Sequence, residues 1–341
     1  MTILFDLNHA AHVHFTRNAY RQLTEEGHNC LVTASDKPLV YELLGEYQIP
    51  FHRMGRIGIS FIAKIFKLVV HDFKMLRYCL KHRPDVILGI VAIRGSHIGW
   101  LLGIKTIVFT DTEHATKQIA IFKPFATEIH TPNWFGMELG DKQHRYSGFH
   151  ELAYLHPDNF SPREEVLDLL GVSAGEPYFI LRFIGWDATH DVGQSGISLA
   201  NKRELVKQLL PYGQVFITSE YELEEEFKQY EYNIPKSYLH DALSYCTILI
   251  GEGATTACEA SMLGVPNILI NTMLWGYITY LEEEYDLLYH LTDQGSLLDK
   301  LQMLLANTNL KAEWQTKRET FLATQQDTTA YIVDLIKAGA K

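Results

Sequence analysis

Residues 251–266, GEGATTACEASMLGVP, combine small residues, hydroxyl side chains and one carboxylate in an order suited to binding an anion. The apolar run that leads into them, residues 247–251, predicts a buried strand ending at a glycine turn. A helix that starts after such a turn presents backbone amides and its positive dipole end to a ligand. Glu259, about one helical turn further on, could accept hydrogen bonds from a vicinal diol such as ribose. The alternative is an ordinary strand-to-helix turn with a threonine N-cap, because a glycine-rich turn alone is a weak signal.

Three histidines, His9, His12 and His14, lie in the segment NHAAHVHF after the first predicted strand, residues 2–7. In an open parallel sheet, ligands bind at this carboxyl end of the strands. No Cys or Asp triad accompanies the histidines, so we predict no metal site there. A general base, with His12 as the candidate, or a phosphate donor is the functional interpretation. A solvated loop is the alternative.

Two carboxylates, Asp111 and Glu113, follow another predicted strand in the segment IVFTDTEHA. Alternation along an extended chain points both side chains to the same side. Neighbouring carboxylates can take separate pKa values and serve as acid and base, so both are candidate catalytic residues. Helix N-capping by Asp111 or Thr112 would explain one carboxylate but not both.

A long polar loop, RFIGWDATHDVGQSGIS (182–198), follows the first predicted strand of the second half. It carries Arg182, Asp187, His190 and Asp191, and it is too long to be only a connector. Polar groups gathered at this end of a strand favour a binding role. The alternative is that the two aspartates only cap turns.

Two series of alternating strands and helices are needed to position these residues. The predicted strands are residues 2–7, 28–35, 85–90, 105–111 and 126–132, then 177–183, 214–220, 247–253 and 266–271. Repeated strand–helix–strand units predict α/β domains with parallel sheets covered on both faces. We expect two doubly wound domains in tandem, residues 1–155 and 156–325, with a cleft between them. Residues 326–341 are expected to form a helix that packs across the domain junction.

Composition excludes several classes of protein. A net charge of -11 argues against nucleic acid as a partner, because phosphate binding needs a basic face. The four cysteines lie far apart, which indicates reduced thiols and neither a disulfide framework nor a zinc site. The N-terminus resembles no signal peptide and no apolar run is long enough to span a membrane, so we expect a cytoplasmic protein.

One segment departs from this acidic average. Residues 53–83 contain eight basic residues and one acidic residue, and residues 60–84 have helical spacing of apolar positions 62, 65, 66, 69, 73, 76 and 80. A basic amphipathic helix of this kind can rest on an anionic membrane, which would place the protein peripherally at the inner membrane face. The alternative is a helix whose apolar stripe covers the sheet while its lysines face water.

The motif of residues 251–266 resembles the donor site of GT-B-fold proteins, the two-Rossmann glycosyltransferases and the non-hydrolysing UDP-N-acetylglucosamine 2-epimerases. That resemblance implies that Gly253, Thr255 and Thr256 meet a diphosphate and that Glu259 holds the uridine ribose. Two further residues, Glu252 and Ala254, belong to the same binding turn. Glu252 departs from the pattern, since a carboxylate beside a diphosphate needs a cation or Arg182 to neutralise it.

The segments DLNHAAHVHFTRNAYRQL, FTDTEHA, RFIGWDATHDVGQSG and ITSE together resemble an uncharacterised GT-B-like family of archaea and bacteria over nearly the whole chain. The family implies a fold with two Rossmann-like domains and no settled activity. In the related epimerases a catalytic glutamate stands at about the place of Glu113, and a loop with a catalytic histidine matches His190. The loop GIVAIRGS (89–96) lacks the aspartate that those epimerases carry.

From these features we expect a glycosyltransferase that needs no metal or cofactor besides a nucleotide-sugar donor, with a UDP-sugar as the first candidate. Its acceptor would be a sugar or lipid-linked sugar used in cell-surface polysaccharide or glycolipid assembly. The alternatives are a 2-epimerase-like enzyme and a non-catalytic protein that binds nucleotide sugars.

Overall fold

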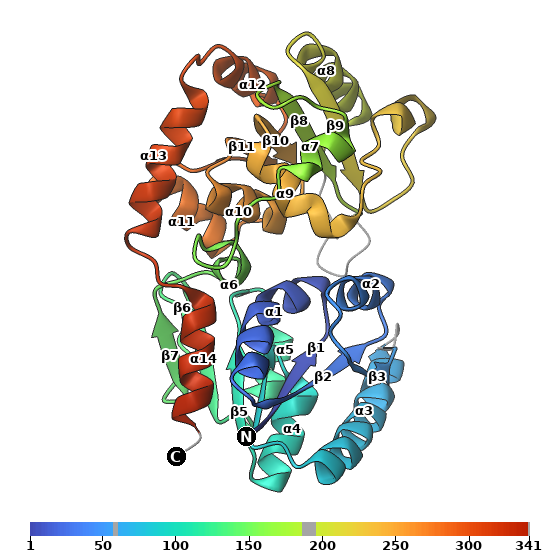
Figure 1. Cartoon of the computed structure of the whole chain (residues 1–341), viewed down its shortest axis with the longest axis vertical. Coiled ribbons are helices and arrows are strands. Elements are labelled where there is room, and N and C mark those ends of the chain that lie inside the picture. Colours follow the sequence, from blue (N-terminus) through green and yellow to red (C-terminus); the bar gives the residue numbers. More distant parts are fainter. Residues whose placement is uncertain (57–60, 186–195, 340–341) are drawn as a thin grey trace. The chain divides into compact units, whose positions relative to one another are not determined.

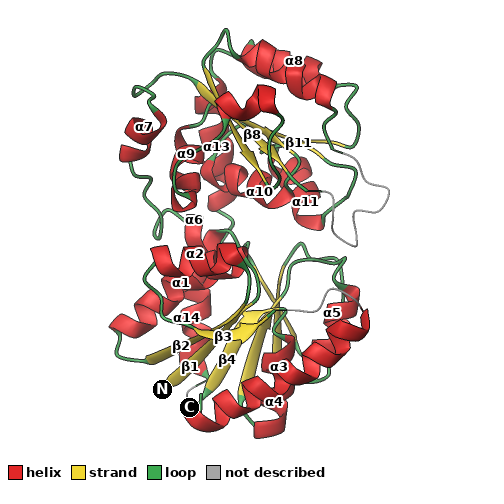
Figure 2. Cartoon of the chain, turned by 90° about the vertical axis from the view of Figure 1, so that its right-hand side faces the viewer, coloured by secondary structure: helices red, strands yellow, loops and turns green. Residues whose placement is uncertain are grey.

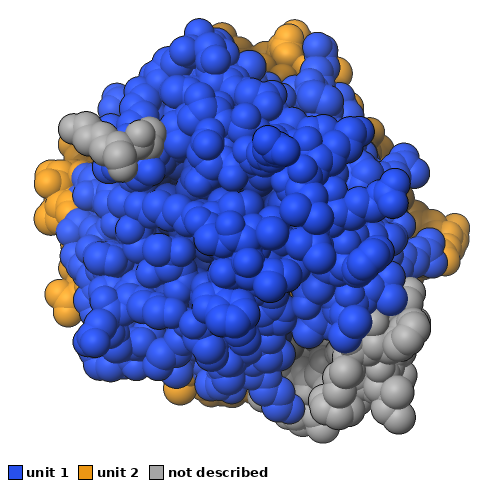
Figure 3. Space-filling view, turned by 90° about the horizontal axis from the view of Figure 1, so that it is seen from below, with its two compact units in different colours: residues 1–160, 325–341 blue, residues 161–324 orange. Residues whose placement is uncertain are grey.

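The computed structural model describes residues 1–56, 61–185 and 196–339 and divides the chain into two compact units. Unit 1 contains Met1–Phe160 and the C-terminal segment that begins at Gln325, and unit 2 contains Ser161–Thr324, as coloured in Figure 3. Each unit has one parallel sheet flanked by helices (Figures 1 and 2). The α/β fold expected from the sequence is therefore confirmed.

The sheet of unit 1 has seven parallel strands in the order β3-β2-β1-β4-β5-β6-β7. Its central strands are almost wholly apolar and buried, as expected for a sheet covered on both faces. The strands are β1 Thr2–Leu7, β2 Asn29–Ser35, β3 His52–Gly55, β4 Val86–Ile90, β5 Lys105–Phe109, β6 Glu128–Pro132 and β7 Gln143–Tyr146. The helices are α1 Ala10–Glu25, α2 Pro38–Glu46, α3 Phe61–His82, α4 Ile93–Leu102, α5 Thr116–Phe122, α6 Leu152–Leu155 and α14 Thr328–Ala338.

The sheet of unit 2 has five parallel strands in the order β12-β11-β10-β8-β9. They are β8 Tyr178–Phe183, β9 Gln214–Ser219, β10 Ile248–Gly251, β11 Asn267–Ile270 and β12 Tyr289–Leu291. The α-helices are α7 Glu165–Leu170, α8 Leu199–Leu209, α9 Leu239–Tyr245, α10 Ala254–Leu263, α11 Gly276–Tyr285, α12 Leu297–Leu305 and α13 Leu310–Leu322. Two short 3₁₀ helices are η1 Glu225–Tyr230 and η2 Lys236–Tyr238.

The C-terminal helix α14 belongs to unit 1, where it packs against α1 and α6. Its buried side chains include Ile332, Val333 and Ile336. Asp327 caps its N-terminus by accepting a hydrogen bond from the Thr329 amide. The apolar face of unit 1 that the helix covers explains its place in that unit, and packing across the domain junction stays a prediction.

A buried ion pair lies at the carboxyl end of the central strands of unit 1. Arg94 on α4 donates from Nε to both carboxylate oxygens of Asp6 on β1, at 2.8 and 3.1 Å, and from Nη1 to the Ser35 hydroxyl at 2.9 Å. The Ser35 hydroxyl in turn donates to the Asn8 side-chain oxygen at 2.8 Å. Asp6 also accepts from the Thr33 hydroxyl. This network fixes the start of the histidine-bearing loop to strands β1 and β2 and to α4.

The apolar stripe of helix α3 was one candidate for the side that covers the sheet. In the structure, a different side of the helix is buried. Among its described residues, His71, Met75 and Cys79 face the core. Val69 and Phe73, two members of the expected core stripe, are exposed. The apolar stripe and the row of core-facing residues lie on different sides of the helix. The helix packs against unit 1 through the core-facing row. No helix in the described part of the chain combines the length and apolar character needed to cross a bilayer.

Candidate functional site

Two loops of unit 2 that carry predicted site residues start at neighbouring points of its sheet. Strand β10 pairs with β8, and Gly251 lies directly beside Arg182. The strand order reverses here, because β9 lies on one side of β8 while β10, β11 and β12 continue on the other. Ligands of open α/β sheets bind at such a reversal, at the carboxyl ends of the strands. The motif found in the sequence therefore lies where the fold favours a ligand.

The two glycines of this turn have different roles. A Cβ atom on Gly251 would lie 2.7 Å from both the Cβ atom and the carbonyl oxygen of Arg182, so this glycine lets β10 and β8 pack together. A Cβ atom on Gly253 would come no closer than 3.3 Å, to the Ile184 side chain. Gly251 therefore serves the packing of the two strands, and Gly253 stays a candidate for close approach of a ligand.

We expect Gly251→Ala to lower the free energy of unfolding by about 1–3 kcal/mol, because the added methyl group has no space against the neighbouring strand. Gly253→Ala is the matched control and should cost clearly less, because only a side-chain methyl group is near. Urea titrations of both variants measure the difference. Equal stability of the two variants would contradict the packing role of Gly251.

The first turn of α10 is open to an anion. Gly253 is its N-cap residue, and no side chain of the described residues caps the helix. Thr255 is exposed, whereas Ala254 and Thr256 are buried. Amides at such an uncapped helix start keep their hydrogen-bonding capacity for a ligand. Gly253, Ala254, Thr255 and Thr256 thus remain candidate anion contacts.

Glu252 has a structural role that replaces its expected contact with a nucleotide. Its side chain is buried, and its carboxylate accepts hydrogen bonds from the Ile184 amide at 2.9 Å and the Ile197 amide at 2.5 Å. These amides lie on either side of residues 186–195. Two backbone donors stabilise the negative charge, so neither a cation nor Arg182 is needed for that purpose.

Arg182 pairs with a different carboxylate. Its Nη2 atom lies 2.6 Å from Oε1 of Glu220, which follows β9, and the other Glu220 oxygen accepts from the Gly185 amide. The Nε atom of Arg182 is buried and has no hydrogen-bond partner among the described residues. The guanidinium therefore lies at the carboxyl end of β8, as expected. His190, Asp187 and Asp191 lie outside the described residues.

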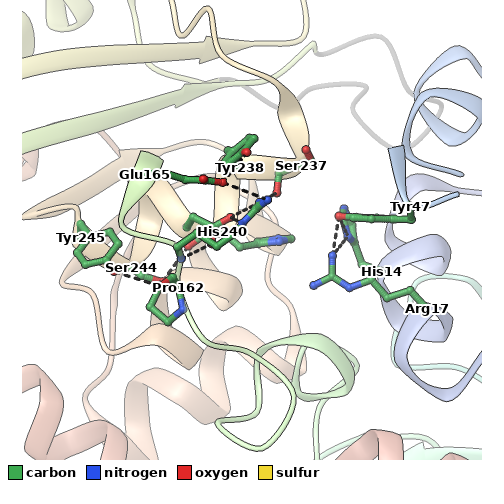
Figure 4. A network of polar contacts seen from close by, with 12 residues as sticks. His14, Arg17, Tyr47, Pro162, Glu165, Ser237, Tyr238, His240, Ser244 and Tyr245 are labelled. Atoms are coloured by element: carbon green, nitrogen blue, oxygen red, sulfur yellow. Dashed lines mark hydrogen bonds and ion pairs between the residues drawn. The ribbon is translucent and has the colours of Figure 1, made fainter. Parts of the chain in front are cut away.

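Glu259 is buried and forms a pair with His240 of α9, at 2.9 Å between Oε1 and Nε2. Figure 4 shows His240 among the polar side chains of this part of unit 2. The sequence predicted that this carboxylate accepts hydrogen bonds from a ligand. The structure shows that it also has a part in stability, because removing it leaves a buried histidine without this partner.

His12 in unit 1 accepts a hydrogen bond on one of its ring nitrogens. Its Nδ1 atom accepts a hydrogen bond from the Asn8 amide at 3.2 Å, which leaves the proton of the neutral ring on Nε2. Burial, then the nearby rings of His9 and His150, hold the pKa of His12 well below its ordinary value of 6.5. A neutral ring with its proton on Nε2 donates to an oxygen atom and does not remove a proton there. The sequence left His12 open as a base or as a donor to a phosphate, and the contact with the Asn8 amide favours the donor role.

Asp111 forms an ion pair with His150, a residue that sequence reasoning missed. The Asp111 Oδ2 and His150 Nδ1 atoms are 2.8 Å apart, and both side chains are largely buried. Burial opposes both charges, but the pair outweighs it, so the pKa of Asp111 is lowered and that of His150 is raised. The Nε2 atom of His150 is buried without a hydrogen-bond partner among the described residues. No spacing signal links positions 111 and 150, and only the fold brings them together.

Glu113 has its own partner. Its Oε1 atom accepts a hydrogen bond from the Gly136 amide at 3.1 Å, and the side chain is half-buried. Asp111 and Glu113 follow β5 as predicted, yet each is oriented by a different loop. Glu113 is thus a carboxylate of fixed orientation at the carboxyl edge of the sheet, and it remains the candidate base.

The other two histidines of the first loop stabilise local structure. His9 is the N-cap of α1, and its Nδ1 atom accepts from the Ala11 amide. His14 lies beside Arg17 and Tyr47, with its Nδ1 atom 3.3 Å from the Tyr47 hydroxyl (Figure 4). The three histidines therefore have different partners and do not converge on one point.

Metal-ligand spacing occurs elsewhere in the described part of the chain, at His156, Asp158 and Asp327. Asp327 is engaged there, since its Oδ1 atom accepts from the Thr329 amide and the Asn159 side chain. Asp158 is exposed, and exposed acidic groups are common without a metal. We assign no metal centre to this group.

Several known proteins are similar to this chain over most of its length. An uncharacterized protein of Methanocaldococcus jannaschii is 23% identical over 324 residues, covering 89% of this chain and 91% of that protein. The Neisseria meningitidis UDP-GlcNAc 2-epimerase bound to UDP-GlcNAc has a TM-score of 0.67 at 12% identity, covering 99% of this chain and 100% of that one. The spinosyn forosaminyltransferase SpnP has a TM-score of 0.66 at 14% identity, covering 100% of both chains.

These likenesses confirm the GT-B-like fold that the sequence motifs indicated. The family comparison covers the full length of the chain. A model described as a protein of unknown function, DUF354, matches residues 1–341, and the chain belongs to that family.

Proposed function

We propose that this protein is a GT-B glycosyltransferase that uses a nucleotide-sugar donor. The observation that carries the proposal is the uncapped start of α10, which follows β10 at the point where the strand order of unit 2 reverses. The donor's diphosphate would accept hydrogen bonds from the amides of residues 253–256 and from the hydroxyl of Thr255. The similarity to solved structures of a glycosyltransferase and a UDP-GlcNAc 2-epimerase also supports a nucleotide-sugar ligand.

The reaction would join an acceptor oxygen to the anomeric carbon of the donor sugar while the bond to the diphosphate breaks. The α10 amides and Arg182 would stabilise the charge that develops on the leaving diphosphate. Glu113 would remove the proton from the acceptor hydroxyl. His12, as a neutral donor, would hydrogen-bond to an oxygen atom of the acceptor or of the transferred sugar.

A sugar-nucleotide epimerase related to the UDP-GlcNAc 2-epimerases is the second candidate. Glu113 and the GT-B-like fold favour it, because such an enzyme also removes a proton from the sugar. It would need no acceptor and would convert the nucleotide sugar alone. A protein that only binds nucleotide sugars would show neither reaction. Products after incubation with and without sugar acceptors distinguish the three.

The proposed setting is the cytoplasmic side of the cell membrane, in the assembly of cell-surface polysaccharide or glycolipid. The acceptor would be a sugar or a lipid-linked sugar. The test of the proposed function is a thermal-shift screen with UDP-, GDP-, CMP- and dTDP-sugars. A rise in melting temperature with at least one of them is expected, with UDP-sugars tested first, and no rise with any of them would refute the donor site.

Substitution of Glu259 tests the proposed contact with the ribose of the nucleotide. Glu259→Ala should weaken binding of the preferred nucleotide about ten- to a hundredfold, through loss of the ribose hydrogen bonds. It should also lower the free energy of unfolding by about 1–3 kcal/mol, because His240 loses a buried partner. Calorimetry and urea titration measure the two effects. Glu259→Gln keeps an acceptor for His240 and should recover most of the stability; unchanged nucleotide affinity in both variants would remove Glu259 from the site.

A further inference from the structure

An exposed apolar surface lies on helices α3 and α4 of unit 1. Phe73 and Trp100 are 67% and 65% exposed, and Val69, Leu80 and Leu101 are also exposed. Large apolar side chains that are exposed and grouped in this way mark interaction surfaces in folded proteins. We call these five residues the α3–α4 patch.

The patch borders a groove between the two helices. Its volume is about 390 Å³, and its lining includes Val69, Phe73 and Trp100 together with Leu76 and Phe125. Asp72, which also lines it, forms an ion pair with His97 at 2.8 Å. The one acidic side chain of residues 53–83 thus has a hydrogen-bonding partner inside the groove.

A row of basic side chains runs beside the patch. Lys74, Arg77 and Lys81 are exposed on α3, each one position after a residue of the apolar row at 73, 76 and 80. One position corresponds to about 100° around a helix, so the basic row flanks the apolar row along its length. Residues 53–83 carry a charge of +7, from eight basic residues and one acidic residue, in a chain of -11.

We infer that the α3–α4 patch docks onto an anionic lipid surface, with Phe73 and Trp100 inserted at the headgroup level. Aromatic side chains prefer this depth, and the neighbouring basic row would meet the lipid phosphates. A symmetric contact between two copies would instead place each basic row near its own equivalent, where like charges repel. Charge complementarity therefore selects an anionic partner over a second copy of this chain. This inference does not depend on the proposed function.

Flotation with vesicles tests the inference on the full chain. Wild type should float with vesicles of phosphatidylglycerol and phosphatidylcholine at low salt, and only weakly with phosphatidylcholine alone. Phe73→Gln/Trp100→Gln should lower the affinity at least about tenfold, because two inserted side chains are lost. Arg77→Gln/Lys81→Gln should also lower it about tenfold or more and should reduce its dependence on salt.

A matched control uses exposed apolar side chains outside the patch. Leu169 and Leu210 in unit 2 are 48% and 46% exposed, and Leu169→Gln/Leu210→Gln should leave vesicle affinity unchanged. Trp100→Phe separates insertion from surface adsorption: it should keep binding but remove most of the blue shift in tryptophan emission that vesicles cause.

Three results would overturn the inference. The first is that wild type fails to float with anionic vesicles at low salt. The second is that the Leu169/Leu210 control loses as much affinity as the Phe73/Trp100 variant. The third is that sedimentation velocity shows a dimer in wild type that becomes a monomer in Phe73→Gln/Trp100→Gln while vesicles are not bound, since the patch would then join two copies.

Discussion

Replacing Arg94 with leucine is expected to lower the free energy of unfolding by about 3–5 kcal/mol, the largest effect on stability that we predict. Asp6 is fully buried, and Arg94 is its only cationic partner among the described residues. Without the guanidinium, the carboxylate keeps the Thr33 hydroxyl as a donor but has no charge to balance it. Urea titration followed by circular dichroism measures the loss.

A surface ion pair provides the control for Arg94. Arg203 and Glu226 form an equally close pair, with Nη2 and Oε1 2.7 Å apart, but both side chains are exposed. Arg203→Leu should therefore cost far less stability than Arg94→Leu, because water screens the pair and solvates the carboxylate that remains. Similar losses for Arg94→Leu and Arg203→Leu would show that burial does not determine the strength of the Asp6 pair.

Glu113→Gln is expected to reduce turnover about 10²–10⁴-fold once a donor and acceptor are identified, under the proposed function. Glutamine keeps the shape of the side chain and its acceptor for the Gly136 amide, but it cannot remove a proton. Nucleotide affinity should change little, because the proposed diphosphate contacts belong to unit 2. Steady-state kinetics and calorimetry measure the two quantities.

His12 is the informative comparison for Glu113. His12→Gln retains a side-chain N–H donor, so as a donor position it should keep much more activity than Glu113→Gln. If His12 were the base instead, the glutamine variant would lose activity fully and Glu113→Gln would remain active. Loss of nucleotide binding in Glu113→Gln would show that the glutamate supports structure only.

Local sequence patterns were sufficient to predict the fold class, because the formation of strands and helices depends mainly on residues that are close in sequence. Alternation of apolar strands with amphipathic helices specifies parallel sheets, and the turn at residues 251–253 marks where a strand gives way to a helix. Such features depend on neighbours within a few residues, which a single sequence displays directly.

Contacts between distant residues could not be predicted in this way. The Asp111–His150 pair spans 39 positions (150 minus 111), and the pairing of Arg94 with Asp6 spans 88. Glu252 was predicted to contact a ligand because of its position in the motif. The sequence does not show the two backbone amides that its carboxylate binds. The orientation of α3 could not be predicted either. Two of its sides carry apolar residues, and only the position of the sheet determines which side is buried.

The return of the chain to unit 1 through α14 has a consequence for the order of folding during translation. Unit 2 is an insertion between residues 160 and 325, so the ribosome completes it before the last helix of unit 1 exists. Until then the hydrogen bonds from the hydroxyls of Thr328 and Thr329 to the carbonyls of Phe149 and Ala153 are missing. The apolar faces of α1 and α6 stay uncovered for the same interval. During the synthesis of unit 2, the N-terminal part of unit 1 therefore lacks a segment that the ribosome makes only afterwards.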